Sequence, residues 1–476
     1  MSDRSTSQSS WRALAEKELR GAPLSSLSPR RHDGIAVEPF LGPDPAREEG
    51  LGDAARTRGS LLVTDRERDL PLAANADGVW WRGSQPPPDG ARVSLVETRT
   101  DPITVEARIA TPEGGIAKQS VVALTDVHES GGSAITEVAV GVAAIVELSR
   151  RRGGAPSEIR IALSVGPELF LEIAKIRALR RLSARVLRTL GVEASLWIAA
   201  RTAQRSLARL DVATNVVRGT IGAAAAMLGG ADVVGVLAMD ADLRDPTPLA
   251  ARIARNVPLV LARESSLWAV DDPARGSFEI EALTDRIARD AWEVVREIER
   301  AGGLVAARAL LRSRIDRDAE ARAVAVRARR IPIVGVSKHP FATDVAAPAA
   351  LDARDASPFE IARAAVSLPV ELVRLGGAEV DARADFVREV LAVGGFEIVA
   401  SGGRAAVVCA PDAAFETDVP RALSELRARG VPAFVAGKPG ESEASLRSAG
   451  ALGFVAMGQD VVAFAAEIRA AVGAGS

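Results

Sequence analysis

The stretch that decides the fold is DVATNVVRGTIGAAAAMLGGAD at residues 211–232, together with RIARNVPLVLARESSLWAVDDPARGSFEIEALTDRIARDAWEVVREIERAGG at residues 252–303. The first segment predicts a helix over residues 211–228 that ends at Gly229 and Gly230, because glycine readily adopts the positive φ angles of a helix C-terminus. We further expect strands at residues 232–240 and 257–262, and helices around residues 246–256 and 281–301. This alternation of helices and apolar strands predicts βα units built on a parallel sheet.

The last of these helices is amphipathic. Its apolar residues recur on one face, and they are Leu283, Ile287, Ala291, Val295 and Ile298. A face of this kind can cover the outside of a parallel sheet. The preceding turn DDPARGSF at residues 271–278 holds two aspartates. We interpret them as cap residues at a helix N-terminus rather than as a catalytic pair.

Outward from this stretch, the chain divides into four predicted segments. Residues 1–41 form an N-terminal helix and arm, and residues 42–340 form the α/β domain that contains the quoted stretch. Residues 341–377 are a linker rich in Ala, Pro and Asp that carries a helix over residues 358–374. Residues 378–476 alternate strands with helices, as a small doubly wound domain requires.

Within the α/β domain, the segment FLEIAKIRALRRLSARV at residues 170–186 predicts another helix, because its apolar residues recur at helical spacing. Its basic residues lie at other angles, and they are Lys175, Arg177, Arg180 and Arg181. We interpret these basic residues as a solvated face of the helix.

The composition argues against several classes of function. The chain has 60 Lys and Arg against 62 Asp and Glu, so its formal net charge of −2 does not suggest nucleic acid or an acidic membrane as a partner. A single cysteine excludes an internal disulfide, and three widely separated histidines give no metal-ligand spacing. The N-terminal residues lack the apolar core of a secretion signal, and no apolar run is long enough to span a bilayer. We therefore expect a cytoplasmic protein.

The phrases at residues 211–232 and 252–303 resemble methylmalonyl-CoA mutases, the cobalamin-dependent isomerases whose catalytic chain pairs a (βα)8 barrel with a C-terminal cobalamin domain. The resemblance implies that residues 42–340 form a shortened or degenerate (βα)8 TIM-type barrel, with the loss mainly in its first half. It also implies that residues 378–476 form a flavodoxin-like domain of the cobalamin-binding type.

Active chains of this family carry a substrate-binding histidine in a phrase of the type RTHxQTS. Counted without gaps from Asp211, its Thr-Ser pair falls on Thr202 and Ala203, and the histidine position is Ala199. An alanine methyl group cannot donate a hydrogen bond to a thioester carbonyl. The family's active sites also use tyrosines, and this chain contains none. The resemblance therefore implies a domain without its catalytic residues.

The C-terminal domain also lacks the family's cobalt ligand. Mutases of this type present a histidine in a loop of pattern DxHxxG, in which the aspartate orients the histidine. Counted back from Gly395 and Phe396, the three positions are Ala378, Val380 and Arg383. The segment AEVDARADFVREVLAVGGFEIV instead resembles the family's small subunit, which keeps the fold without the cofactor. We expect this chain to bind no cofactor and no metal.

The resemblance implies a non-catalytic small subunit that supports a catalytic large subunit in a heterodimer. Adenosylcobalamin is then expected in the partner, which would interconvert methylmalonyl-CoA and succinyl-CoA. The N-terminal segment resembles an arm that leads toward the partner, so Trp11 and Phe40 are candidate interface residues. Two alternatives stay open: an active acyl-CoA mutase component that uses cobalamin from a separate chain, and a stand-alone acyl-CoA-binding protein.

Overall fold

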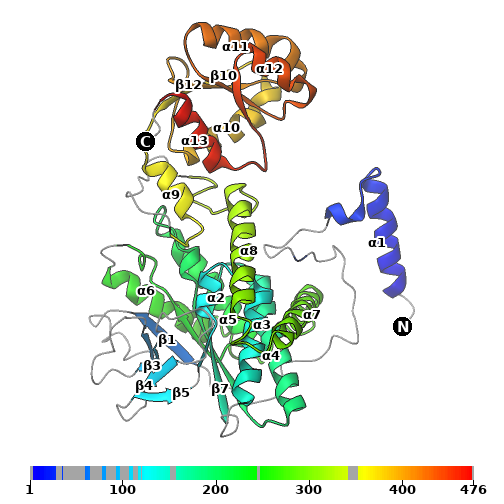
Figure 1. The fold of residues 1–476 in the computed structure, drawn as a ribbon, viewed down its shortest axis with the longest axis vertical. Coiled ribbons are helices and arrows are strands. Elements are labelled where there is room, and N and C mark those ends of the chain that lie inside the picture. Colours follow the sequence, from blue (N-terminus) through cyan, green and yellow to red (C-terminus); the bar gives the residue numbers. More distant parts are fainter. Residues whose placement is uncertain are drawn as a thin grey trace. The chain divides into compact units, whose positions relative to one another are not determined.

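The computed structural model shows two compact units (Figure 1). The first comprises Met1–Ser206 and Asn215–Arg322, and the second comprises Leu207–Thr214 and Ala323–Ser476. Each unit buries an apolar core of its own. The structure describes residues 4–27, 35, 59–64, 78–81, 93–96, 107–110, 116–119, 121–150, 157–243, 247–340 and 352–473.

A parallel sheet forms the centre of the first unit, and its strand order is β3-β2-β1-β9-β8-β7-β6. The strands are β1 (Gly59–Thr64), β2 (Gly78–Trp81), β3 (Val93–Val96), β6 (Val121–Ala123), β7 (Glu158–Val165), β8 (Ser195–Thr202) and β9 (Val233–Val236). In chain order, β1 is the first strand of this sheet and β9 is the last, and these two strands pair with each other. Strands β4 (Ala107–Ala110) and β5 (Ile116–Gln119) form a separate antiparallel pair. The predicted α/β class with a parallel sheet is confirmed.

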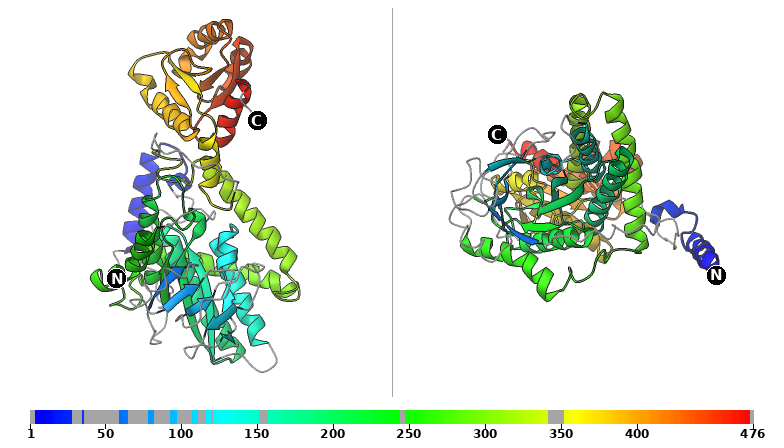
Figure 2. Two further views of the ribbon diagram at one scale, coloured as in Figure 1. Left: turned by 90° about the vertical axis from the view of Figure 1, so that its left-hand side faces the viewer. Right: turned by 90° about the horizontal axis from the view of Figure 1, so that it is seen from below.

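The helices of the first unit are α1 (Arg4–Glu18), α2 (Thr125–Glu129), α3 (Ala134–Ser149), α4 (Leu169–Leu190), α5 (Thr214–Gly229), α6 (Pro248–Leu259), α7 (Phe278–Arg300) and α8 (Arg308–Arg327), the last of which continues into the second unit. Helices α2 to α5 alternate with strands β6 to β9 of the parallel sheet, and the other helices precede or follow them. Figures 1 and 2 show α3, α4 and α7 side by side, and these helices contact one another. Within the described ranges, no helix combines the length and the apolar character needed to cross a membrane.

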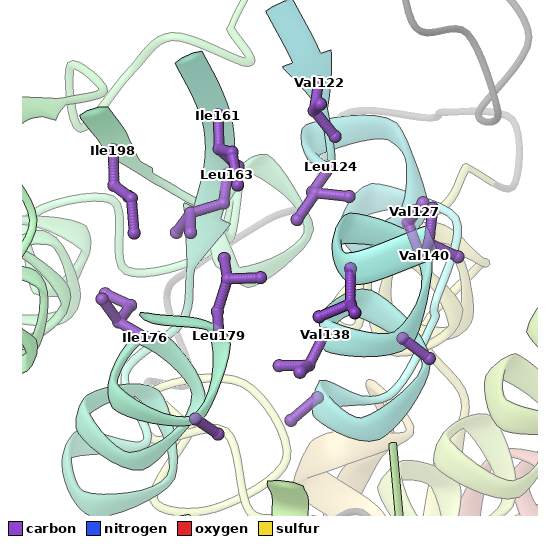
Figure 3. Packing of buried hydrophobic residues seen from close by; sticks show 14 of the residues in the cluster. Val122, Leu124, Val127, Val138, Val140, Ile161, Leu163, Ile176, Leu179 and Ile198 are labelled. Atoms are coloured by element: carbon purple, nitrogen blue, oxygen red, sulfur yellow. The ribbon is translucent and has the colours of Figure 1, made fainter. Parts of the chain in front are cut away.

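The core of the first unit includes the layer between strands β6 to β8 and helices α3 and α4 (Figure 3). Ile161 and Leu163 of β7 and Ile198 of β8 lie opposite Ile176 and Leu179 of α4. Each of these five side chains is at most 1% exposed. Burial of such a side chain contributes roughly 1.5–3 kcal/mol, so this layer fixes α4 against the sheet.

Two of the predicted helices are confirmed with small shifts at their ends. Helix α5 occupies the segment predicted at residues 211–228, and Gly230 follows it with φ +90°. Helix α7 begins three residues earlier than expected, at Phe278. Its predicted apolar face is buried throughout, and it consists of Leu283, Ile287, Ala291, Val295 and Ile298.

The strand predicted at residues 257–262 is wrong, because these residues are helical. Helix α6 extends to Leu259 and continues as a π-helical turn over Val260–Glu264. A short apolar run cannot be assigned to strand or helix by periodicity alone. The buried residues of α6 recur at helical spacing, and they are Ala250, Ala251, Ala254 and Pro258. Packing on this face selects the helix.

The second unit contains a parallel sheet with the strand order β11-β10-β12-β13-β14. Its strands are β10 (Pro369–Arg374), β11 (Glu397–Val399), β12 (Ala405–Cys409), β13 (Ala433–Ala436) and β14 (Ala451–Val455). Its helices are α9 (Ser357–Ala364), α10 (Asp381–Val393), α11 (Asp418–Ala428), α12 (Glu443–Ala449) and α13 (Val461–Ala471). In order along the chain, the strands therefore lie 2-1-3-4-5 across the sheet.

Strand β10 corrects the predicted linker helix over residues 358–374. Helix α9 ends at Ala364, and Pro369–Arg374 form a strand inside the sheet. Proline lacks a backbone N–H, and its ring disfavours helical backbone in the residue before it, so the helix cannot continue through Pro369. The sheet consequently begins before residue 378, the start that we expected for this domain.

Candidate functional site

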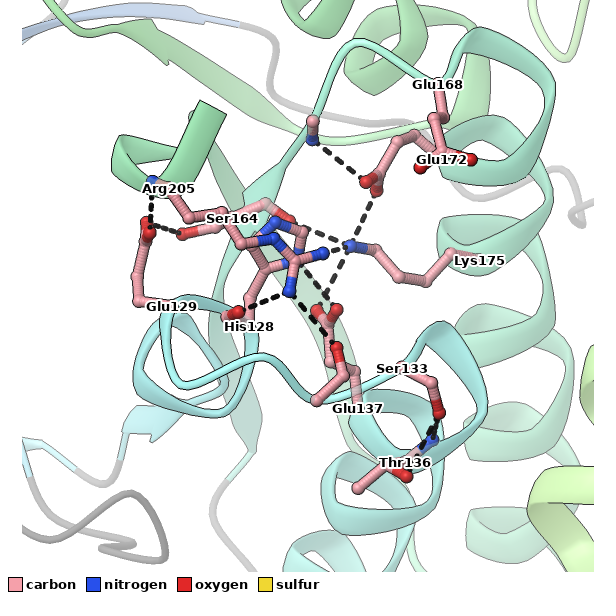
Figure 4. Close-up of polar contacts among 12 residues, drawn as sticks. His128, Glu129, Ser133, Thr136, Glu137, Ser164, Glu168, Glu172, Lys175 and Arg205 are labelled. Carbon is pink, nitrogen blue, oxygen red and sulfur yellow. Dashed lines mark hydrogen bonds and ion pairs between the residues drawn. The ribbon is translucent and has the colours of Figure 1, made fainter. Parts of the chain in front are cut away.

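A buried polar cluster lies at the carboxyl ends of β6, β7 and β8 (Figure 4). We call it the carboxyl-end cluster, and it consists of His128, Glu129, Glu137, Ser164, Glu172, Lys175, Arg201 and Arg205. Parallel α/β sheets place their functional sites at this edge, because the loops that leave the strands converge there. The cluster is therefore the first place to look for chemistry in this unit.

Glu129 joins the three strand ends. Its Oε1 accepts hydrogen bonds from Ser164 Oγ at 3.0 Å, from Arg201 Nη1 at 2.8 Å and from the backbone N–H of Gln204 at 3.0 Å, and its Oε2 accepts one from the backbone N–H of Arg205 at 2.8 Å. Burial alone would raise the pKa of Glu129, but Arg201 and the two backbone donors outweigh it and hold that pKa below its usual range. The ionised carboxylate thus ties the turn after β8 to α2 and β7.

Lys175 projects from α4 between two carboxylates. Its Nζ donates hydrogen bonds to Glu137 Oε2 at 3.0 Å and to the carbonyl oxygen of Ser164 at 2.8 Å, and it lies 2.6 Å from Glu172 Oε2. Glu172 also accepts a hydrogen bond from the backbone N–H of Gly166 at 2.9 Å. Burial alone would lower the pKa of Lys175, but the two carboxylates outweigh it and raise that pKa, so the ammonium stays charged.

His128 and Glu137 complete the cluster on the side of α2 and α3. Nδ1 of His128 lies 2.7 Å from Glu137 Oε1, and both side chains are almost completely buried. Burial raises the pKa of Glu137 to about 8, with Glu172 adding to the rise and Lys175 opposing it. Burial, together with the nearby Arg205 and Lys175, lowers the pKa of His128 well below its ordinary value. His128 is therefore neutral, and Nε2 of its ring has no hydrogen-bond partner among the described residues.

The cations of the cluster are bound by groups of the protein itself. Arg205 Nη1 donates hydrogen bonds to the carbonyl oxygens of His128 at 2.6 Å and Gly132 at 3.4 Å. Arg201 pairs with Glu129, and Lys175 pairs with Glu137 and Glu172. A cation that already neutralises a buried carboxylate is costly to withdraw from it. The arrangement is thus suited to holding the strand ends in place.

Of the four basic residues interpreted as a solvated face of α4, Lys175, Arg177 and Arg180 are buried and Arg181 is partly buried, so that interpretation is wrong. Arg177 pairs with Asp272 and Glu281, Arg181 pairs with Glu281 and Asp285, and Arg180 Nη2 lies 2.5 Å from Asp232 Oδ2. The reason is that α4 lies between the sheet and α7, and acidic residues of α7 and its preceding turn face it. Asp272 accordingly serves as an ion-pair partner, and the cap interpretation of this aspartate is wrong as well; the N-cap of α7 is Ser277.

Ala199, the counted position of the substrate histidine, lies inside β8 and is completely buried between Ala162 and Val233 of the neighbouring strands. The phrase RTHxQTS can also be placed directly on Arg201 and Thr202, which puts its histidine at Ala203. Ala203 follows the last residue of β8, at the carboxyl edge where sites of parallel sheets lie. The residue is an alanine at both positions.

In the second unit, Ala378 and Val380 form a single 3-10 turn between β10 and α10, and Arg383 lies in the first turn of α10. Alanine and valine offer no ligand atom, and Arg383 offers a cation, so these residues do not fit a histidine-ligated cobalamin. Among the described residues, no group of three His, Cys, Asp or Glu side chains could hold a metal ion.

Of the candidate interface residues, Trp11 lies half-buried on α1, while Phe40 lies outside the described residues. His128, Glu137 and Lys175 could not be recognised as one cluster from the sequence, because they come from three helices with no common spacing. The available sequence signal was the pair of polar residues in VHES, at residues 127–130, soon after an apolar strand-like run.

Residues 118–365 match the sequence family described as methylmalonyl-CoA mutase. A probable methylmalonyl-CoA mutase small subunit of Mycobacterium tuberculosis is 34% identical over 348 residues, which cover 64% of this chain and 57% of the relative. The methylmalonyl-CoA mutase small subunit of Streptomyces virginiae is 40% identical over 230 residues, covering 46% of this chain and 37% of the relative. The large subunit of the same organism is 32% identical over 231 residues, covering 46% and 32%. The chain thus spans little more than half the length of the first of these relatives.

Proposed function

The chain belongs to the methylmalonyl-CoA mutase family, and from this premise we propose that it acts as a non-catalytic small subunit. In this role it supports a catalytic partner chain that interconverts methylmalonyl-CoA and succinyl-CoA. The chain itself binds no cofactor, and adenosylcobalamin is held by the partner.

One observation carries the proposal. The position of the family's substrate histidine is an alanine, whether it is counted as Ala199 or as Ala203. Polarisation of a reacting carbonyl by a fixed donor is worth orders of magnitude in rate, and a methyl group supplies none of it. The nearby Arg201 and Arg205 are engaged by Glu129 and by backbone carbonyls, so they do not replace the missing donor.

The sheet topologies support the finer fold assignment. In the first unit, β1 pairs with β9, so the described strands follow the order of a barrel that is interrupted between β3 and β6. This order supports a shortened (βα)8-type barrel. In the second unit, the 2-1-3-4-5 order is that of flavodoxin-like domains. It supports a fold of the cobalamin-binding type without the ligand histidine.

The names of the relatives support a two-chain assembly. Streptomyces virginiae has both a small and a large methylmalonyl-CoA mutase subunit, and this chain is similar to each. We place the partner contact on the N-terminal segment, with Trp11 and Phe40 as anchors, because aromatic side chains commonly dominate the energy of interfaces. An obligate contact of this kind buries roughly 2,000 Å² or more.

The experiment is co-expression with the large-subunit chain of the same genome, followed by affinity capture and mass measurement. We expect a stable one-to-one complex, and we expect deletion of residues 1–40 or replacement of Trp11 by alanine to weaken it. Separate elution of the two chains at micromolar concentration would contradict the subunit role. An intact complex after the deletion would contradict only the placement of the contact.

A further inference from the structure

Arg383 lies at the point where the strand order of the second sheet reverses. Strand β10 leads into α10, which carries Arg383, and the chain then continues to β11 on one side of β10 and to β12 on the other. In open α/β sheets of this order, ligands bind outside the carboxyl ends of the strands at this reversal. The side chain at residue 383 therefore occupies a position where a ligand would be expected.

The guanidinium of Arg383 reaches from α10 to the loop that follows β12. Its Nη1 donates a hydrogen bond to the carbonyl oxygen of Ala410, and its Nη2 lies 2.7 Å from Asp412 Oδ1. Its Cζ also lies 5.7 Å from the centre of the Phe415 ring, within the range of a cation–π contact. Asp412 is 77% exposed, so its ion pair with Arg383 contributes little. The contacts with Ala410 and Phe415 therefore hold the arginine in place.

The turn after β13 closes on the same group. Gly437 directly follows β13 with φ +125°. A Cβ atom at this residue would lie 3.0 Å from Cζ of Phe415 and 3.3 Å from Nη1 of Arg383, which is tighter than ordinary contact. Arg383 and Phe415 thus pack against bare backbone at Gly437. One arginine consequently meets the segments that follow β10, β12 and β13.

We infer that the side chain of Arg383 occupies the ligand position of the second unit. It thereby prevents a corrinoid from binding at this edge of the sheet, independently of the missing histidine. In the family's DxHxxG loop this position is a glycine, which has no side chain to place at this edge of the sheet. The inference rests on the proposed absence of a cofactor in this chain. It does not depend on the partner subunit.

The binding test uses the full chain, with hydroxocobalamin as the probe. Ala378→Asp/Val380→His restores the ligand pair and keeps Arg383, and two further variants add either Arg383→Ala or, as a matched control on the exposed side of α10, Arg388→Ala. We expect histidine coordination in the absorbance spectrum, and at least tenfold tighter retention in equilibrium dialysis, only when Arg383 is removed. Equal binding with and without Arg383, or no binding without it, would overturn the inference.

A second measurement on the otherwise native chain covers the case in which the combined variants fold poorly. Arg383→Ala should speed amide hydrogen exchange at residues 410–416 and 437–440 by at least tenfold, and Arg388→Ala should leave it unchanged. Unchanged exchange after Arg383→Ala would also overturn the inference. Both readouts are obtained without the large subunit, so their failure leaves the proposed subunit role standing.

Discussion

Single residues of the carboxyl-end cluster are held in ionisation states that depend on burial and on the sharing of positive charge. Lys175 contacts both Glu137 and Glu172. Ionising both of two buried carboxyl groups that share one cation is unfavourable in free energy. Burial therefore keeps the proton on Glu137 up to about pH 8. Burial and then the surrounding cations, Arg205 first among them, lower the pKa of His128 and keep its ring neutral.

Glu137→Gln should change how stability depends on pH. The folded-state pKa of Glu137 is raised from 4.5 to about 8, so its stabilising effect is fully present below 4.5 and is lost as the pH rises to about 8. The native free energy of unfolding should thus contain a term that falls across this range, on the order of a few kcal/mol. The glutamine variant should lack that term in urea unfolding series, whereas Glu147→Gln on the same helix should keep it. Equal slopes for the native chain and the Glu137→Gln variant would contradict the raised pKa.

His128→Gln tests the opposite sign. The folded-state pKa of His128 is lowered well below 6.5, so its stabilising effect is present above 6.5 and is lost as the pH falls toward the folded value. We expect the glutamine variant to lose less stability than the native chain on acidification below about pH 6, since buried imidazole no longer has to be charged. His339→Gln, at a side chain that is 73% exposed, serves as the control. Thermal unfolding at several pH values provides the measurement, and identical acid sensitivity of all three proteins would refute the explanation.

At the scale of elements, the ion pairs between α4 and α7 enclose charged side chains that the sequence pattern predicted to face solvent. Arg177 and Arg181 of α4 share Glu281 of α7, and all three side chains are largely buried. Helices α3, α4 and α7 pack together on apolar faces, so the charges are enclosed with them. A buried cation that loses its partner is much more costly than an exposed one.

Glu281→Gln should therefore destabilise the chain by about 3 kcal/mol, the lower end of the expected range because Asp272 still faces Arg177. Glu293→Gln removes an exposed pair with Arg296 on the same helix and should change the free energy of unfolding by less than about 0.5 kcal/mol. Chemical denaturation of both variants provides the comparison. Equal losses of unfolding free energy in the two variants would contradict a larger stabilising contribution from the buried Glu281 pairs.

At the scale of the whole molecule, the proposed non-catalytic role predicts that the purified chain has no mutase activity of its own. It contains no tyrosine, and alanine stands at Ala199 and Ala203. We expect purified protein with adenosylcobalamin and methylmalonyl-CoA to form no succinyl-CoA above background. Ala203→His should leave this result unchanged, because Ala378 and Val380, at the counted cobalt-ligand positions, offer no ligand atom. The assay is product detection by mass spectrometry, with a catalytic large subunit as the positive control. Turnover by either homogeneous protein would refute the non-catalytic role.

The sequence alone determined the parts of this protein that depend on local pattern. Helical periodicity was sufficient to predict α5 and α7, and the quoted phrases were sufficient to identify the family. Both signals lie in residues that are close together in the sequence. The assignment of Ala378 and Val380 to the ligand-loop positions was likewise counted from the sequence, and it stays a prediction.

Only the tertiary structure decided which neighbours surround each charge and each apolar run. The run at residues 257–262 is helical because α6 buries one apolar face. The segment from Pro369 is a strand because it pairs with β11 and β12, and these partners lie too far along the chain for a local pattern to reveal them. Lys175 became an internal ion-pair partner because α3 brings Glu137 against it, in addition to Glu172 on its own helix. Burial and long-range pairing set these outcomes, and neither quantity is encoded in the spacing of adjacent residues.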